Sequence, residues 1–146
     1  MAFRDTVEAN QQIGSCYKQG IQALKKKHRN KVQPQNPGSL NGSVDIEACL
    51  DDPDEGESRW DYMVGYEEAA YFIEVHPADS KHVGEMVKKV NWLKQWLNRN
   101  PKIKGLQANQ DPFRWVSTNG VHIQGNYKFK LSEHGLTMPQ KQTTLP

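Results

Sequence analysis

Three residues near the middle of the chain, Asp61, Glu74 and His76, have side chains that could bind a divalent metal or move a proton. They fall in two segments, 60–66 and 69–77, that are rich in the aromatic and β-branched residues typical of β-strands. Only two residues separate the segments, so the sequence predicts an antiparallel hairpin. This hairpin would carry all three side chains.

The centre of the hairpin turn determines which residues face each other. A turn centred between Glu67 and Glu68 places Asp61 directly opposite Glu74. His76 has the same parity as Glu74 and therefore lies on the same face of the strand. A slip of one residue would move these side chains to opposite faces. The other face is predicted to be almost wholly apolar and carries Trp60, Tyr62, Val64, Tyr66, Tyr71, Ile73 and Val75.

Two carboxylates that face each other across paired strands repel. The repulsion is small if both side chains reach solvent, and it becomes useful if a cation lies between them. Carboxylate oxygens beside an imidazole are suitable ligands for Mg²⁺ or Mn²⁺. The residues alone therefore leave two hypotheses open, a solvated sheet edge and a metal site with Asp61 and Glu74 as ligands.

The spacing of apolar residues predicts two helices. A capping box formed by Asp5 and Glu8 precedes a helix from about residue 6 to 29. A second helix runs from about residue 80 to 98 and carries one apolar stripe, which should be its buried face. The stripe consists of Val83, Met86, Val87, Val90, Leu93 and Leu97.

Further strands are predicted where apolar and polar residues alternate. These segments are 44–50, 113–118 with a return at 121–124 after a tight turn, and 127–131. The turn-forming segment 33–43 and the acidic run 51–57 are predicted to be connections. The order helix, strand, strand, strand, helix, strand predicts an α/β fold with a mixed sheet flanked by helices. We expect one domain over residues 1–135 and a polar, poorly ordered tail over 136–146.

Composition limits the class of protein. The 146 residues contain no apolar run long enough to span a bilayer, and the first residues lack the apolar stretch of a secretory signal. Cys16 and Cys49 are too few and too isolated to predict a disulfide framework or a zinc site, so we expect two reduced thiols. These features favour a soluble, cytoplasmic protein.

Positive charge gathers in two places although the net charge is only +2. Lys25, Lys26, Lys27 and Arg29 form one basic block, and Lys88 and Lys89 begin a second. Such a block is often just a solvated face. As a functional alternative, both could hold a nucleic-acid backbone without reading its bases.

In layout and motif the chain resembles the PD-(D/E)XK nuclease superfamily, which has the restriction-endonuclease-like fold. The matching pieces are residues 60–62 for the first acid, 71–76 for the strand that carries the second, and the helix that follows. The resemblance implies that Asp61 and Glu74 bind Mg²⁺ or Mn²⁺, with the Val75 carbonyl contributing. His76 stands where the family has lysine, and Lys81 could supply the missing charge.

Two functions follow from the resemblance. The first is metal-dependent hydrolysis of phosphodiester bonds in DNA or RNA. The second is a catalytically silent, nuclease-like module, of phage, immunity or antitoxin type, that binds a protein or nucleic acid, with a homodimer also compatible. A lysine within reach of Glu74 and an open cleft would favour the first. A filled cleft, or His76 bonded back into the protein, would favour the second.

Overall fold

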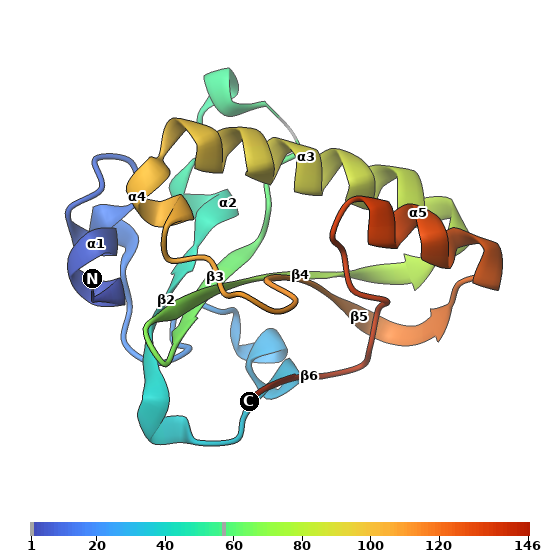
Figure 1. Cartoon of the computed structure of the whole chain (residues 1–146), viewed down its shortest axis with the longest axis horizontal. Coiled ribbons are helices and arrows are strands. Elements are labelled where there is room, and N and C mark those ends of the chain that lie inside the picture. Colours follow the sequence, from blue (N-terminus) through green and yellow to red (C-terminus); the bar gives the residue numbers. More distant parts are fainter. Residues whose placement is uncertain (1, 57) are drawn as a thin grey trace.

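The computed structural model describes residues 2–56 and 58–146 and contains a four-stranded mixed sheet with helices packed on it (Figure 1). The α-helices are α1 (Phe3–Glu8), α2 (Ile46–Cys49), α3 (Val83–Arg99), α4 (Pro101–Lys104) and α5 (Lys128–Glu133). The strands are β1 (Val32–Pro34), β2 (Leu40–Asp45), β3 (Tyr62–Tyr66), β4 (Ala69–Asp79), β5 (Phe113–His122) and β6 (Thr143–Leu145). No helix in these two ranges is long and apolar enough to cross a membrane.

The main sheet has the order β2-β3-β4-β5, antiparallel except for the parallel pair β4 and β5. Helix α3 provides the crossover between those two parallel strands and lies along one face of the sheet (Figure 1). A second, two-stranded parallel sheet joins β1 to β6. The predicted α/β class and mixed sheet are therefore confirmed.

The predicted hairpin register is confirmed. Met63 pairs with Phe72 and Gly65 with Ala70, on either side of a turn in which Glu67 and Glu68 both have positive φ. Both faces of the hairpin are covered. One face contributes Met63 and Phe72 to a core beneath α1 and α3. The other face contributes the predicted apolar residues to a second core, except Trp60, which packs in the first.

The long first helix predicted for residues 6–29 is wrong. Helix α1 ends at Glu8, because the Asn10 side chain accepts hydrogen bonds from the backbone N–H groups of Gln12 and Ile13 and turns the chain. Ile13 is buried in the core beneath α1 and α3, whereas Leu24 is buried in the core on the opposite sheet face. Their helical spacing therefore reflects two separate contacts. The capping box is also absent from α1, which begins at Phe3, before Asp5.

Two predicted strand assignments also need correction. Only Val44 and Asp45 of the strand expected at 44–50 lie in a strand, β2, which begins at Leu40 within the segment expected to be a connection. Strand β2 ends at Asp45, because the Asp45 carboxylate accepts the Ala48 N–H at 3.0 Å and starts α2. The segment 127–131 is part of a 3₁₀ turn and α5, with Phe129 73% exposed. The expected tight turn at 119–120 is a bulge within β5, since Ala78 pairs with Val121 after His76 pairs with Ser117.

The C-terminal segment is ordered by pairing, which corrects the expectation of a loose tail. Residues Thr143–Leu145 form β6 against β1, and Leu145 is completely buried. The Ser117 N–H also donates to the Gln140 carbonyl at 2.8 Å. Residues 136–146 therefore belong to the same folded unit as the main sheet.

The two cysteines form a disulfide, so the expectation of reduced thiols is wrong. Cys16 ends a short 3₁₀ helix and Cys49 ends α2, with their Cα atoms 6.1 Å apart. The bridge joins segments 33 residues apart in the sequence. It holds the N-terminal loop region against α2, the helix that follows β2.

Candidate functional site

The predicted acidic pair lies where β3 begins, beside the second half of β4. Asp61 directly precedes β3, and its backbone N–H donates to Glu74 Oε1 at 3.0 Å. The Asp61 carboxylate in turn accepts the backbone N–H of Val75 at 3.0 Å. The two side chains are adjacent, as the register predicted, and each binds the backbone of the opposite strand.

Glu74 is almost inaccessible to solvent and has two cationic neighbours. Its side chain is 1% exposed, and Lys89 Nζ of α3 lies 3.1 Å from Glu74 Oε2. His76 Nδ1 lies 3.4 Å from the same oxygen. Lys89 Nζ also donates to the Arg59 carbonyl at 3.1 Å. Lys89 was predicted to bind nucleic acid from the surface, but it is buried beside the acid instead.

The site opens to solvent through a cavity of about 520 Å³. Its acidic lining residues are Asp45, Glu47, Asp51, Asp61 and Glu74. Its basic lining residues, apart from histidine, are Lys25, Lys27, Arg59 and Lys89. His28, His76 and Tyr62 complete the titratable lining. The cavity therefore combines a buried carboxylate pair with a rim of mixed charge, in which Lys25, Lys27 and Arg59 face Asp45, Glu47 and Asp51.

Burial and negative neighbours disturb the titration of Asp61. Burial raises the pKa of the Asp61 carboxyl to about 9, with further contributions from the Glu74 charge and a hydrogen bond to Glu47. The positive charge of Lys89 and the Val75 N–H oppose this rise. At neutral pH the Asp61 carboxyl therefore keeps its proton, and a bound cation would favour its ionised form.

Lys89 and His76 hold their protons more firmly than usual. Burial alone would lower the pKa of the Lys89 ammonium, but the charges of Glu74 and Asp61 outweigh it and raise the pKa. Burial likewise opposes the positive charge of His76, yet the hydrogen bond to Glu74 and the charges of Glu74 and Glu85 raise its pKa. Both groups are therefore available as cations beside Glu74.

Glu47 is a site residue that the sequence did not reveal. Residue 47 was expected among the polar residues of a half-buried strand, with no link to Asp61. In the structure it begins the first turn of α2, and the backbone N–H groups of Ile46 and Glu47 both reach the Asp61 carbonyl, at 2.8 and 3.4 Å. The short helix thereby directs a third carboxylate toward the pair. The capping signal at Asp45 could have indicated this helix start.

The predicted nucleic-acid residues divide into two groups. Lys25 and Lys27 line the cavity, and Lys26 and Lys88 are exposed outside its lining. Arg29 is not free to bind a phosphate there, because its guanidinium donates to the carbonyls of Leu24 and Gln22, both at 3.0 Å. Lys81 is exposed and does not line the cavity, so the geometry gives it no role beside Glu74.

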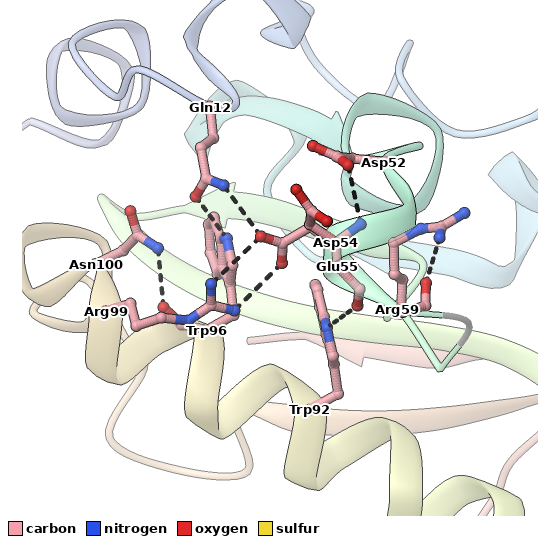
Figure 2. Close-up of polar contacts among 10 residues, drawn as sticks. Gln12, Asp52, Asp54, Glu55, Arg59, Trp92, Trp96, Arg99 and Asn100 are labelled. Carbon is pink, nitrogen blue, oxygen red and sulfur yellow. Dashed lines mark hydrogen bonds and ion pairs between the residues drawn. The ribbon is translucent and has the colours of Figure 1, made fainter.

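The described part of the acidic run is attached to α3 through Glu55, while Glu57 lies outside the described residues. Figure 2 shows the Glu55 carboxylate between Arg99, at 3.2 and 3.3 Å, and Gln12, at 3.3 Å. The indole N–H of Trp92 donates to the Glu55 carbonyl at 2.8 Å. These contacts hold the loop that leads to Arg59, whose guanidinium contacts Asp51 at 3.5 Å at the cavity rim.

A second group of ligand-type side chains lies next to the pair. The group consists of His76, His82 and Glu85. One potential ligand atom from each side chain lies within 4.8 Å of the other two. His82 Nδ1 lies 2.6 Å from Asp79 Oδ1. This group comes from the end of β4, the short 3₁₀ turn Ser80–His82 and the first turn of α3.

Comparison with known proteins returned no relatives. No protein-family model, no curated protein and no solved structure matches the chain.

Proposed function

We propose that this chain is a nuclease-like protein that hydrolyses phosphodiester bonds in nucleic acid with a divalent metal held by Asp61 and Glu74. The observation that carries the proposal is the buried carboxylate pair in an open cavity whose rim bears Lys25, Lys27 and Arg59. The order α1, β2, β3, β4, α3, β5 and the mixed sheet support the restriction-endonuclease-like fold that the sequence resemblance implies.

The donor set fits Mg²⁺ or Mn²⁺. Asp61 and Glu74, with Glu47 beside them, offer the carboxylate oxygens that these hard cations prefer. Burial, and after it the charge of Glu74, raises the pKa of Asp61, and a bound cation would favour the ionised form of this carboxyl. When bound, the metal would polarise a phosphoryl oxygen and lower the pKa of a bound water.

In the nuclease family, a lysine two residues after the second acid supplies a cation. In this chain Lys89 supplies that cation beside Glu74. Its ammonium reaches Glu74 from α3, so the charge is retained although the sequence position holds His76. An ammonium there can stabilise the charge that develops on a phosphate and orient the attacking water. Lys25 and Lys27, at the cavity rim, would hold the nucleic-acid backbone through phosphate contacts alone.

One observation favours the silent, nuclease-like alternative. His76 is bonded back into the protein, with Nδ1 3.4 Å from Glu74 and Nε2 3.2 Å from Glu85. A histidine held in this way is less free to orient a water than one that points into the cavity. Lys89, within reach of Glu74, and the open cavity favour hydrolysis instead. A cleavage experiment distinguishes the two functions.

The test is cleavage of single- and double-stranded DNA and RNA with Mg²⁺ or Mn²⁺ and with chelator. If the chain is a hydrolase, we expect cleavage that depends on the metal. This cleavage should be lost in Asp61→Asn and in Glu74→Gln, and retained in the exposed control Asp5→Asn. His76→Lys should preserve or increase it, because a cation would again follow Glu74. Cleavage that survives in the Asp61→Asn, Glu74→Gln double variant would reject both functions, because the chemistry would lie elsewhere.

Nucleic-acid binding has its own matched control. Lys25→Ala with Lys27→Ala should weaken binding and reduce the salt dependence by about one to two released counterions, because each phosphate contact releases about one. Lys26→Ala should change little, since Lys26 lies between them but does not line the cavity. Nucleic-acid binding without metal-dependent cleavage would mean that the chain is the catalytically silent, nuclease-like protein. An equal loss of binding in Lys26→Ala and in the Lys25→Ala, Lys27→Ala double variant would argue against the cavity as the binding surface.

A further inference from the structure

The segment from Glu74 to Glu85 brings together two imidazoles and one carboxylate in a pattern typical of transition-metal sites. The ligand atoms of His76, His82 and Glu85 lie within 4.8 Å of one another, and the two imidazole rings meet edge to face at 5.1 Å. His76 Nε2 is 3.2 Å from Glu85 Oε2. Ligand atoms around a tetrahedral zinc ion stand about 3.3 Å apart, given metal–ligand bonds of about 2.0 Å.

Each histidine also has a carboxylate at its other ring nitrogen. Glu74 Oε2 lies 3.4 Å from His76 Nδ1, and Asp79 Oδ1 lies 2.6 Å from His82 Nδ1. A carboxylate at the second nitrogen fixes the ring orientation and makes the imidazole a better ligand, which is the usual arrangement around metal-binding histidines. This leaves Nε2 of both rings for a cation shared with Glu85.

We propose that His76, His82 and Glu85 bind a divalent transition metal such as Zn²⁺, with Glu74 and Asp79 orienting the two imidazoles. Two imidazole nitrogens and one carboxylate oxygen favour Zn²⁺ over Mg²⁺, which prefers oxygen ligands and keeps much of its water. The three protein ligands leave one tetrahedral position for water or an added anion. This site stands whether or not the chain cleaves nucleic acid.

The local fold explains why these side chains meet. Glu74 and His76 are two residues apart on β4 and share a face of the strand. His82 ends the 3₁₀ turn Ser80–His82, and Glu85 follows it three residues later in the first turn of α3, so both side chains face back toward the strand end. The Glu85 side chain is 49% exposed, which leaves a path for a metal from solvent.

The experiment is a Zn²⁺ titration of chelator-treated protein by calorimetry, with Co²⁺ absorption as a report of tetrahedral geometry. With a large excess of Mg²⁺ present to occupy Asp61 and Glu74, one saturable Zn²⁺ site is expected, and the Mg²⁺ should not displace the zinc. Glu85→Ala and His82→Ala should each lower the Zn²⁺ affinity at least tenfold, and Asp79→Asn should lower it by about 10- to 100-fold. His134→Ala removes a histidine outside the group and should leave the affinity unchanged.

Asp61→Asn separates this site from the proposed catalytic pair. It should leave Zn²⁺ affinity unchanged, because Asp61 is not a member of the ligand group. Zn²⁺ should also raise the melting temperature of the wild type but not of Glu85→Ala, whose half-exposed side chain is not needed for folding. The absence of saturable Zn²⁺ binding, or equal affinity in the wild type and in both Glu85→Ala and His82→Ala, would overturn the proposal.

Discussion

Lys89 Nζ lies 3.1 Å from Glu74 Oε2, and both side chains are nearly inaccessible to solvent, at 10% and 1% exposed. Removing one member of a buried ion pair leaves the other as an uncompensated charge. This contact therefore links the stability of the fold to the candidate site. It joins α3 to the centre of the sheet beside the residues proposed to bind metal.

Lys89→Met should destabilise the protein by about 3–5 kcal/mol, because Glu74 would remain buried without a cation. Adding Glu74→Gln should recover a large part of the loss, since the unpaired charge disappears. Urea denaturation measures both effects. Lys88 is next to Lys89 in the sequence but lies on the exposed face of α3. Lys88→Met should therefore change the free energy of unfolding by less than about 0.5 kcal/mol. Equal effects at the two lysines would contradict the buried pair.

Asp61→Asn should stabilise the metal-free protein increasingly as the pH rises. The folded-state pKa of Asp61, about 9, exceeds the ordinary carboxyl value of 3.8, so the folded state binds more protons between them and loses stability as pH increases. The advantage of Asp61→Asn over the wild type should grow by up to about 4 kcal/mol from about pH 5 to about pH 8, at about 1.4 kcal/mol for each pH unit. Denaturation at several pH values measures it. Exposed Asp5→Asn should show no such trend.

Val90→Ala should cost about 1–3 kcal/mol, because truncating a fully buried aliphatic side chain loses transfer energy and leaves a cavity. Val87→Ala is the matched comparison on the same helix. It should cost less, since Val87 is only partly buried. Thermal or chemical unfolding distinguishes the two. A cost below about 0.5 kcal/mol for Val90→Ala would mean that this face of α3 is not core.

Replacing both cysteines by serine should lower the free energy of unfolding by about 2–4 kcal/mol, since the bridge restricts the unfolded chain. The bridge closes a loop between Cys16 and Cys49, which are 33 residues apart in the sequence. Reductant should lower the stability of the wild type to a similar extent and leave the double variant unchanged. Mass spectrometry after alkylation without reductant should find no free thiol in the wild type. Full labelling of both cysteines would contradict the disulfide.

Local pattern was enough for the central hairpin and for α3. The spacing of apolar residues and the two-residue turn predicted the register that places Asp61 beside Glu74. The stripe on α3 was mostly right, because helical periodicity alone determines which side chains share a face. Trp96 is buried although it lay off the predicted stripe, and its indole N–H donates to Gln12 at 3.0 Å. Such a partner, 84 residues away in the sequence, could not be identified from local pattern.

The sequence by itself therefore determined the α/β class, the hairpin and the adjacency of Asp61 and Glu74, because these depend on periodicity and on contacts close along the chain. Tertiary structure decided that Lys89 is the lysine beside Glu74, that Glu47 approaches Asp61, and that Cys16 meets Cys49. It also decided the ordering of residues 136–146, through the pairing of β6 with β1. Each of these depends on how elements distant in the sequence pack together. The spacing of side chains along one element does not say which side chain of a distant element will contact them.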